Sequence, residues 1–179
     1  MAYNKRIYVA YDGKNDVSKY MTMKEWVQSD GSDFPFYDGY DLFKKLEQIP
    51  DEALKLEIRE RMKLSEVCVL LATETTKRYR KFIRWQIETA INGNIPLIIL
   101  NVNGIRSVDY DRIPMILKRK KTHISLHLSF QPEILEFALQ DWPDRYRAYL
   151  EKGELKTYRY SNKVYESLGL DTSDYQSIL

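Results

Sequence analysis

The feature that most constrains this sequence is a strand-like run, a polar loop and a helix-like stretch that follow one another over residues 67–93. Residues 67–72 read VCVLLA, and a run so uniformly apolar predicts a central strand covered on both faces. A helix is expected from about Lys81 to the Asn92-Gly93 stop, and residues 95–102 (IPLIILNV) predict a second central strand. Such a unit implies two parallel strands joined by a right-handed crossover. In open α/β sheets, ligands bind outside the carboxyl ends of the strands.

The remainder of the chain predicts further strands and helices in alternation. Strands are expected at residues 6–11, 34–37 and 122–130, helices at 19–28, 52–64, 132–140 and 143–152, and one helical turn at 115–118. This order predicts an α/β fold, a flavodoxin-like three-layer sandwich around a mostly parallel five-stranded sheet. Residues 1–152 are expected to form the domain, and 153–179 a C-terminal helical extension that ends in a loose tail.

Two local patterns give sharper expectations. Residues 122–130 alternate, with His123 and His127 on the polar side, which predicts a half-exposed strand at an edge of the sheet. Pro143 follows Trp142, and because proline restricts the residue before it, the last helical region is expected to break there.

Composition narrows the setting. The chain has 179 residues, one cysteine and a net charge of +2, which together favour a cytoplasmic protein without an internal disulfide and make nucleic acid an unlikely partner. No apolar run approaches the ~20 residues of a membrane span. The basic run at 118–121 is interpreted as a solvated loop.

The common catalytic and phosphate-binding motifs are absent. The sequence has no G-x-G-x-x-G, no G-K-[ST] and no G-x-S-x-G, and Cys68 lies inside an apolar strand, as a buried structural thiol would. His123 and His127 would stand roughly 13 Å apart along a strand. No metal site is therefore expected.

Several segments resemble one family. The first strand ends in VAYD, residues 34–38 read FPFYD, and residues 81–90 read KFIRWQIETA before NIPLII. These segments resemble the TIR-like proteins of Thoeris antiphage defence, and the similarity spans about residues 5–142. The resemblance implies a TIR fold and an enzyme that uses NAD as its substrate. Such an enzyme releases nicotinamide and makes an ADP-ribose-derived, often cyclic, signal for a separate effector protein. The resemblance also makes a homo-oligomer a possible assembly of this chain, since related domains often assemble to complete a site.

Carried over by the resemblance, the family's catalytic glutamate falls on Gln86, and a family tryptophan falls on Phe82. A glutamine keeps the shape but carries no charge, so binding without efficient turnover is expected. Of the nearby carboxylates, Glu88 faces away on the helix, whereas Glu74 in the preceding loop is the one that could approach the site. Three interpretations of Gln86 stay open: an introduced change, a natural non-hydrolysing relative, or a helix residue that is misaligned with the motif.

The other expected site residues follow from their places at strand ends and in the loop. Each has packing, turn formation or capping as its alternative role. The candidates for contacts with the nucleotide are Ala10, Tyr11, Asp12, Asp38, Thr73, Thr76, Phe82 and Trp85.

Two other functional hypotheses remain. One is a non-catalytic TIR-like module that binds a nucleotide or assembles with partners. The weaker one is a receiver domain of the response-regulator kind, for which Asp12 and Asp38 are present but no convincing phosphoacceptor stands on a central strand.

Overall fold

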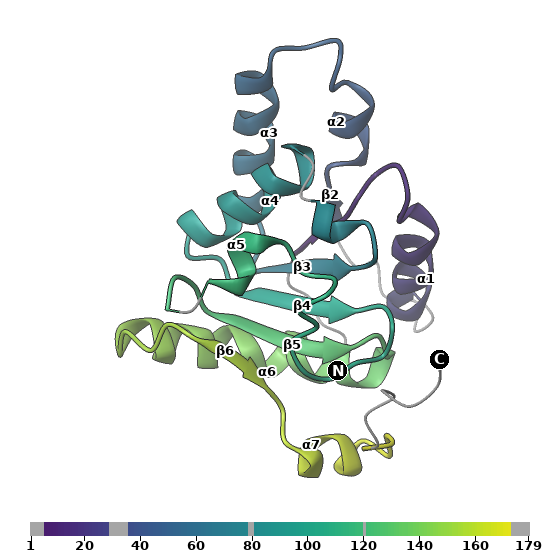
Figure 1. Ribbon diagram of the computed structural model, residues 1–179, viewed down its shortest axis with the longest axis vertical. Helices are drawn as coiled ribbons and strands as arrows, with labels where there is room; N and C mark the ends of the chain where they lie inside the picture. The colour runs from purple at the N-terminus through teal and green to yellow at the C-terminus, as the bar shows by residue number, and fades with distance from the viewer. Residues whose placement is uncertain (1–5, 29–35, 79–80, 120, 173–179) are drawn as a thin grey trace.

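One parallel sheet organises the chain (Figure 1). The computed structural model describes residues 6–28, 36–78, 81–119 and 121–172. Its six strands lie in the order β2-β1-β3-β4-β5-β6, and every neighbouring pair is parallel. They are β1 (Ile7–Ala10), β2 (Phe36–Asp38), β3 (Val67–Ala72), β4 (Leu97–Asn101), β5 (Ser125–Ser129) and β6 (Thr157–Arg159).

Helices cover both faces of this sheet, which confirms the three-layer α/β fold. Alternate strand residues point to opposite faces, so the core divides into two clusters. One cluster lies under α1 (Val17–Gln28), α6 (Pro132–Glu151) and α7 (Asn162–Ser167). The other lies under α2 (Tyr40–Lys44), α3 (Asp51–Lys63), α4 (Lys81–Asn92) and α5 (Met115–Lys118).

The sixth strand corrects the expectation of five. β6 follows α6 and pairs with β5, with Leu126 opposite Tyr158. Two of the crossover connections differ in hand. The strands move in the same direction across the sheet from β3 to β4 and from β5 to β6. The connecting helices, α4 and α6, lie on opposite faces of the sheet. α6 lies on the face of α1, and Trp142 from α6 is among the residues that bury that face.

The expectation of a half-exposed edge strand at residues 122–130 is wrong. β6 occupies the edge, and all residues of β5 are buried. The polar face of β5 is covered because Ile113 and Leu117, from the loop and helix before it, pack into the adjoining cluster. His127 is fully buried there, and burial lowers its pKa to about 3, so the ring is neutral and serves as a polar core residue.

The expected helix break at Pro143 is also wrong, since α6 is continuous and contains this proline. Pro143 has no N–H to donate to the carbonyl of Leu139, one turn earlier. The helix continues because Trp142, Pro143 and Tyr146 are all buried on this side of the sheet. Here tertiary packing outweighs the local preference.

The other elements agree with the expected ranges to within a few residues, apart from α2, which was expected to be a polar connection. Phe34 and Pro35 of the predicted second strand, Lys120, and residues 173–179 of the predicted tail lie outside the described residues. After residue 152, Tyr165 of α7 is fully buried in the core. In the described part of the chain, no helix is long and apolar enough to cross a membrane.

Candidate functional site at the carboxyl ends of the strands

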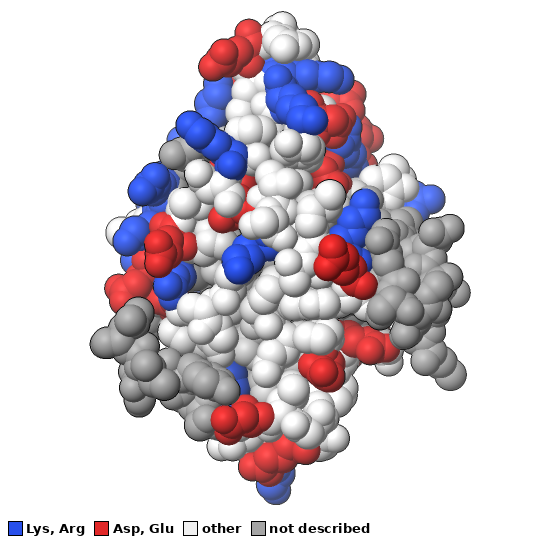
Figure 2. Space-filling view, turned by 90° about the vertical axis from the view of Figure 1, so that its right-hand side faces the viewer, with Lys and Arg blue, Asp and Glu red and all other residues white. Residues whose placement is uncertain are grey.

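The candidate residues gather where the strands of the sheet end. Figure 2 views this side of the molecule, toward which the strand arrows of Figure 1 point. The charged side chains lie mainly around the margin of this face, and its middle is mostly uncharged.

At the end of β1, one side chain packs against a neighbouring ring and the next forms a turn. The rings of Tyr11 and Tyr20 stack with their centroids 4.6 Å apart. The Tyr11 hydroxyl is buried, with no hydrogen-bond partner in the described part of the chain, and burial raises its pKa. Asp12 accepts bonds from the Lys14 N–H at 2.9 Å and from Asn15 Nδ2 at 2.8 Å, which closes the turn after the strand.

The end of β2 is tied to the same tyrosine pair. The Tyr20 hydroxyl donates to Asp38 Oδ2 at 2.6 Å, and the Tyr40 N–H donates to Asp38 Oδ1 at 2.8 Å. The main-chain carbonyl of Asp38 accepts from Arg61 at 2.6 Å. Tyr20 therefore links the ends of β1 and β2, which brings the predicted residues Tyr11 and Asp38 together.

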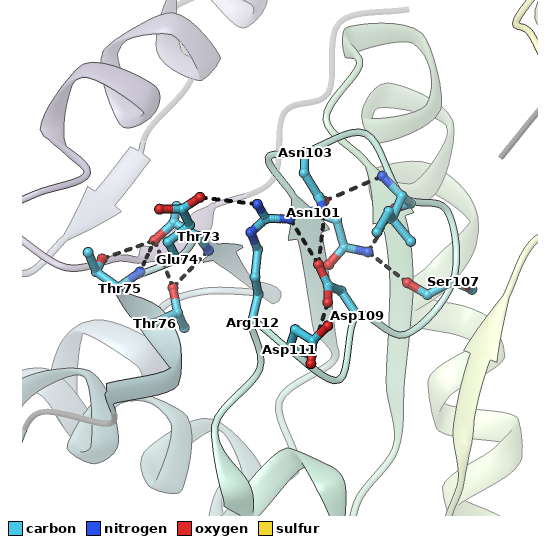
Figure 3. Close-up of polar contacts among 11 residues, drawn as sticks. Thr73, Glu74, Thr75, Thr76, Asn101, Asn103, Ser107, Asp109, Asp111 and Arg112 are labelled. Carbon is cyan, nitrogen blue, oxygen red and sulfur yellow. Dashed lines mark hydrogen bonds and ion pairs between the residues drawn. The ribbon is translucent and has the colours of Figure 1, made fainter. Parts of the chain in front are cut away.

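The loop after β3 is closed by a hydroxyl cluster around a carboxylate that sequence reasoning missed. Asp16 Oδ2 accepts from the hydroxyls of Thr73 at 2.9 Å and Thr75 at 3.1 Å. The Thr76 hydroxyl donates to the Leu71 carbonyl at 3.0 Å and accepts from the Thr73 N–H at 2.9 Å. Figure 3 shows the contacts among the threonines of this loop. The two predicted threonines therefore meet, but their hydroxyls are already used within the protein.

Asp16 itself is 4% exposed. Burial raises the pKa of its carboxyl group, while the bonds from Thr73 and Thr75 act in the opposite direction. The only signal in the sequence was its place in the polar loop after the first strand, a place that many solvated residues share.

Gln86 lies on the inner side of α4 and is 1% exposed. The Tyr8 hydroxyl, from β1, donates to Gln86 Oε1 at 3.1 Å. Gln86 Nε2 donates to the carbonyl of Phe82, one turn earlier, at 3.3 Å. Tyr8 is fully buried and its pKa is raised well above the usual value, chiefly by burial, so its hydroxyl stays protonated and can donate. The amide is thus used at both ends, as acceptor and as donor.

The aromatic neighbours of Gln86 belong to the core. Phe82 is 5% exposed and meets Phe43 edge-on, with 5.8 Å between the ring centroids. A Cβ atom at Gly39 would lie 2.8 Å from the Phe82 ring and 3.0 Å from the Tyr8 hydroxyl oxygen. A side chain at position 39 would therefore force the Phe82 ring or the Tyr8 hydroxyl to move.

Trp85 lies on another side of α4, in the same core cluster and 4% exposed. The ammonium groups of Lys55 and Lys81 lie over its ring, 5.2 Å and 5.3 Å from the centroid. These contacts support packing and a cation–π role for Trp85.

A second polar network, absent from the sequence predictions, continues the site past β4 (Figure 3). Asn101, the last residue of β4, donates to the carbonyls of Ile105 and Ser107, both at 2.8 Å. Asp109, which is 6% exposed, accepts from Asn103 at 2.8 Å and pairs with Arg112 at 3.1 Å.

Arg112 also reaches Glu74, at 3.4 Å, and so joins this network to the loop after β3. Glu74, the carboxylate considered as a substitute for the missing charge, is thus paired with a cation at the surface. In the sequence, residues 101–104 read NVNG, a signal for a turn but not for a network.

The described contacts thus arrange the predicted residues in three groups. Tyr11 and Asp38 meet through Tyr20, the threonines meet through Asp16, and Phe82 and Gln86 meet beneath Tyr8. Among the described residues, no three His, Cys, Asp or Glu side chains lie together as metal ligands would.

A family model described as the TIR-like domain of the Thoeris protein ThsB matches residues 8–107, more than half of the chain. This range runs from β1 through β4 and contains all the predicted site residues. No curated protein matches the chain.

Proposed function

The chain belongs to the family of the Thoeris ThsB TIR-like domain, and on this premise we propose that it acts in antiphage defence by binding NAD or an ADP-ribose-derived nucleotide with little or no turnover. The binding site in this proposal is the carboxyl edge of β1, β2 and β3. The proposal takes the family from the match, and the ligand from the resemblance of the strand–loop–helix unit to NAD-cleaving relatives.

The observation that carries the weak-turnover part is the state of Gln86. Its side chain is uncharged and buried, and both ends of the amide are bonded, to Tyr8 and to the carbonyl of Phe82. A carboxylate here would still accept from Tyr8, but its second oxygen would face the Phe82 carbonyl, which is also an acceptor. The surroundings therefore favour a neutral amide over the glutamate expected of a catalyst.

The missing charge has a kinetic consequence. Departure of nicotinamide leaves positive charge on the ribose, and a fixed negative group stabilises that transition state more than the ground state. The loss of one such electrostatic contribution typically costs about 10²–10³ in rate. A Gln86 chain is thus suited to hold or sense the nucleotide.

An NAD glycohydrolase or cyclase is the second candidate, favoured by the family match across the whole strand–loop–helix unit. Such an enzyme would make a signal for a separate effector protein, and self-association could complete its site. This candidate requires nicotinamide release by the unaltered chain, with Gln86 in place.

The decisive experiment follows nicotinamide release and NAD binding for the unaltered chain and for Gln86→Glu. Gln140→Glu, on the exposed side of α6, is the matched control because it adds the same charge away from the site. We expect NAD binding without measurable release by the unaltered chain and by the control, and release by Gln86→Glu.

Other results would decide against one part or the whole of the proposal. Fast release by the unaltered chain would overturn the weak-turnover part and favour the second candidate. An absence of NAD binding by all three folded proteins would overturn the nucleotide-binding proposal itself.

A further inference from the structure

A cavity lies away from the candidate site, near the amino ends of β5 and β6. It has a volume of about 220 Å³ and opens beside α5 and the chain that leads into β5. In Figure 1 these segments lie on the left, away from the strand arrowheads. We call this cavity the basic pocket; it is lined by Tyr110, Leu117, Lys118, Arg119, Lys121, His123, Leu155, Lys156 and Thr157.

The charge of the basic pocket is entirely of one sign. Among the described residues, its lining contains four cationic side chains, those of Lys118, Arg119, Lys121 and Lys156, and no carboxylate. Lys156 lies 3.8 Å from Glu154 outside the lining, a weak contact between exposed groups. The other three cations are close together in the sequence, and next to them the Thr122 hydroxyl donates to the Arg119 carbonyl at 3.1 Å. Four like charges around so small a cavity repel one another, and a bound anion would relieve that repulsion.

The inner wall adds groups that suit the uncharged part of an organic anion, because the Thr122 hydroxyl donates to the Arg119 carbonyl and so leaves His123 Nε2 as an acceptor for a ligand hydroxyl. His123 is 4% exposed, and its Nε2 has no hydrogen-bond partner in the described part of the chain, whereas Nδ1 lies 3.2 Å from the Thr122 hydroxyl. Buried polar atoms are nearly always paired, so an unpaired imidazole nitrogen in a cavity wall is a reason to look for a ligand. Leu117 is buried and gives the wall an apolar part, while Tyr110 is 54% exposed at the rim.

From this arrangement we propose that the basic pocket binds a small phosphate monoester of the size of a sugar phosphate. The phosphate lies among Lys118, Arg119 and Lys121, where arginine can bind two of its oxygens at once. The sugar lies against Leu117 and the ring of Tyr110. This site is separate from the carboxyl edge of the sheet and does not depend on the function proposed there.

The pocket fits a small ligand better than a nucleic acid. A duplex needs several phosphate contacts along an extended basic surface, whereas here the cations surround one cavity of about 220 Å³. The net charge of the chain is only +2, so its overall field gives little attraction for a polyanion.

The test is calorimetric titration of the whole chain with ribose 5-phosphate, with ribose and inorganic phosphate as separate arms. We expect ribose 5-phosphate to bind, ribose not to bind, and inorganic phosphate to bind more weakly. Loss of one charge-assisted contact should weaken binding by about tenfold or more, so Arg119→Gln is the first variant.

Lys121→Gly is the sharper variant. Lys121 has φ of +60°, a conformation that glycine adopts without steric cost. This variant should fold at least as well as the unaltered chain, as judged by its melting temperature, and yet bind ribose 5-phosphate about tenfold more weakly. Lys163→Gln on α7 is the control, because it removes an equal charge from an exposed residue outside the pocket.

Specific outcomes would overturn the proposal. These are equal binding of ribose and ribose 5-phosphate, undiminished binding by Lys121→Gly, or an equal loss in Lys163→Gln. If inorganic phosphate binds as tightly as ribose 5-phosphate, the pocket does not recognise the sugar, and the proposal of a sugar phosphate is wrong. A short single-stranded oligonucleotide that binds more tightly than ribose 5-phosphate, and depends on Lys121, would replace the small ligand by nucleic acid.

Discussion

The Tyr8 hydroxyl donates a hydrogen bond to Gln86 Oε1 at 3.1 Å and so ties the first strand of the sheet to α4. Both side chains are almost fully buried. A substitution at either residue should therefore change the stability of the fold. The first two predictions concern this pair.

Gln86→Glu should lower the free energy of unfolding at neutral pH by about 2 kcal/mol or more, because a buried carboxylate oxygen would face the Phe82 carbonyl. The folded-state pKa of the new glutamate should be raised above its unfolded value of about 4.3. The loss should therefore shrink as the pH falls through that raised pKa toward 4.3. Urea denaturation across this pH range measures the free energy of unfolding of both proteins. In the control, Gln140→Glu, that free energy should not increase relative to the unaltered chain as the pH falls.

Tyr8→Phe removes only the hydroxyl and leaves Gln86 Oε1 buried without its donor. We expect a loss of about 1–2 kcal/mol in the free energy of unfolding. Tyr110→Phe, which removes a hydroxyl from a side chain that is 54% exposed, should change stability by less than about 0.5 kcal/mol. Equal effects of the two substitutions would show that the bond to Gln86 contributes little.

The carboxylate of Asp16 should make stability depend on pH. Its pKa is raised from the usual 3.8, chiefly by burial, so the folded state binds the proton more tightly than the unfolded state does. The stability of the unaltered chain relative to Asp16→Asn should therefore rise as the pH falls through the raised pKa toward 3.8. Paired denaturation curves at several pH values measure this difference. A difference that falls over the same range would contradict the direction of the shift.

Pro143→Ala should stabilise α6 by about 1 kcal/mol. Alanine is about 3 kcal/mol more favourable than proline inside a helix, and the loss of roughly two buried methylene groups costs about 1.6 kcal/mol in return. Pro132→Ala is the control, because Pro132 is exposed at the first position of the same helix, where proline is well tolerated. That control should leave stability unchanged or slightly lower it in thermal or urea unfolding.

The sequence was sufficient for the central part of the fold. The apolar runs at 67–72 and 95–102 coincide closely with β3 and β4, since strands buried on both faces leave a strong local pattern. The sequence was less informative where distant segments decide the outcome. The alternation in 122–130 is real, but loop and helix residues such as Ile113 and Leu117 cover its polar side, and β6 covers its edge.

The candidate site shows the same division. The threonine loop and the end of β2 could be named from the sequence because polar residues directly after strands mark an edge of the sheet. The roles of Asp16 and Asp109 could not, because each is defined by partners that fold next to it, such as Thr73 or Arg112. The burial of Gln86 was likewise not predictable from its helical position, since only the packing of α4 on Tyr8 sets it.

The strand order has a practical consequence for anyone who divides this chain at the limits of the family match. Residues 8–107 end after β4, so such a fragment lacks β5, β6 and the long helix α6. The hydrogen-bonding edge of β4 would then be open, and the face beneath Ile98 and Leu100 would lose the cover of α6. A fragment of this kind would self-associate through the open strand edge and the exposed apolar face, and its ligand binding could not be measured.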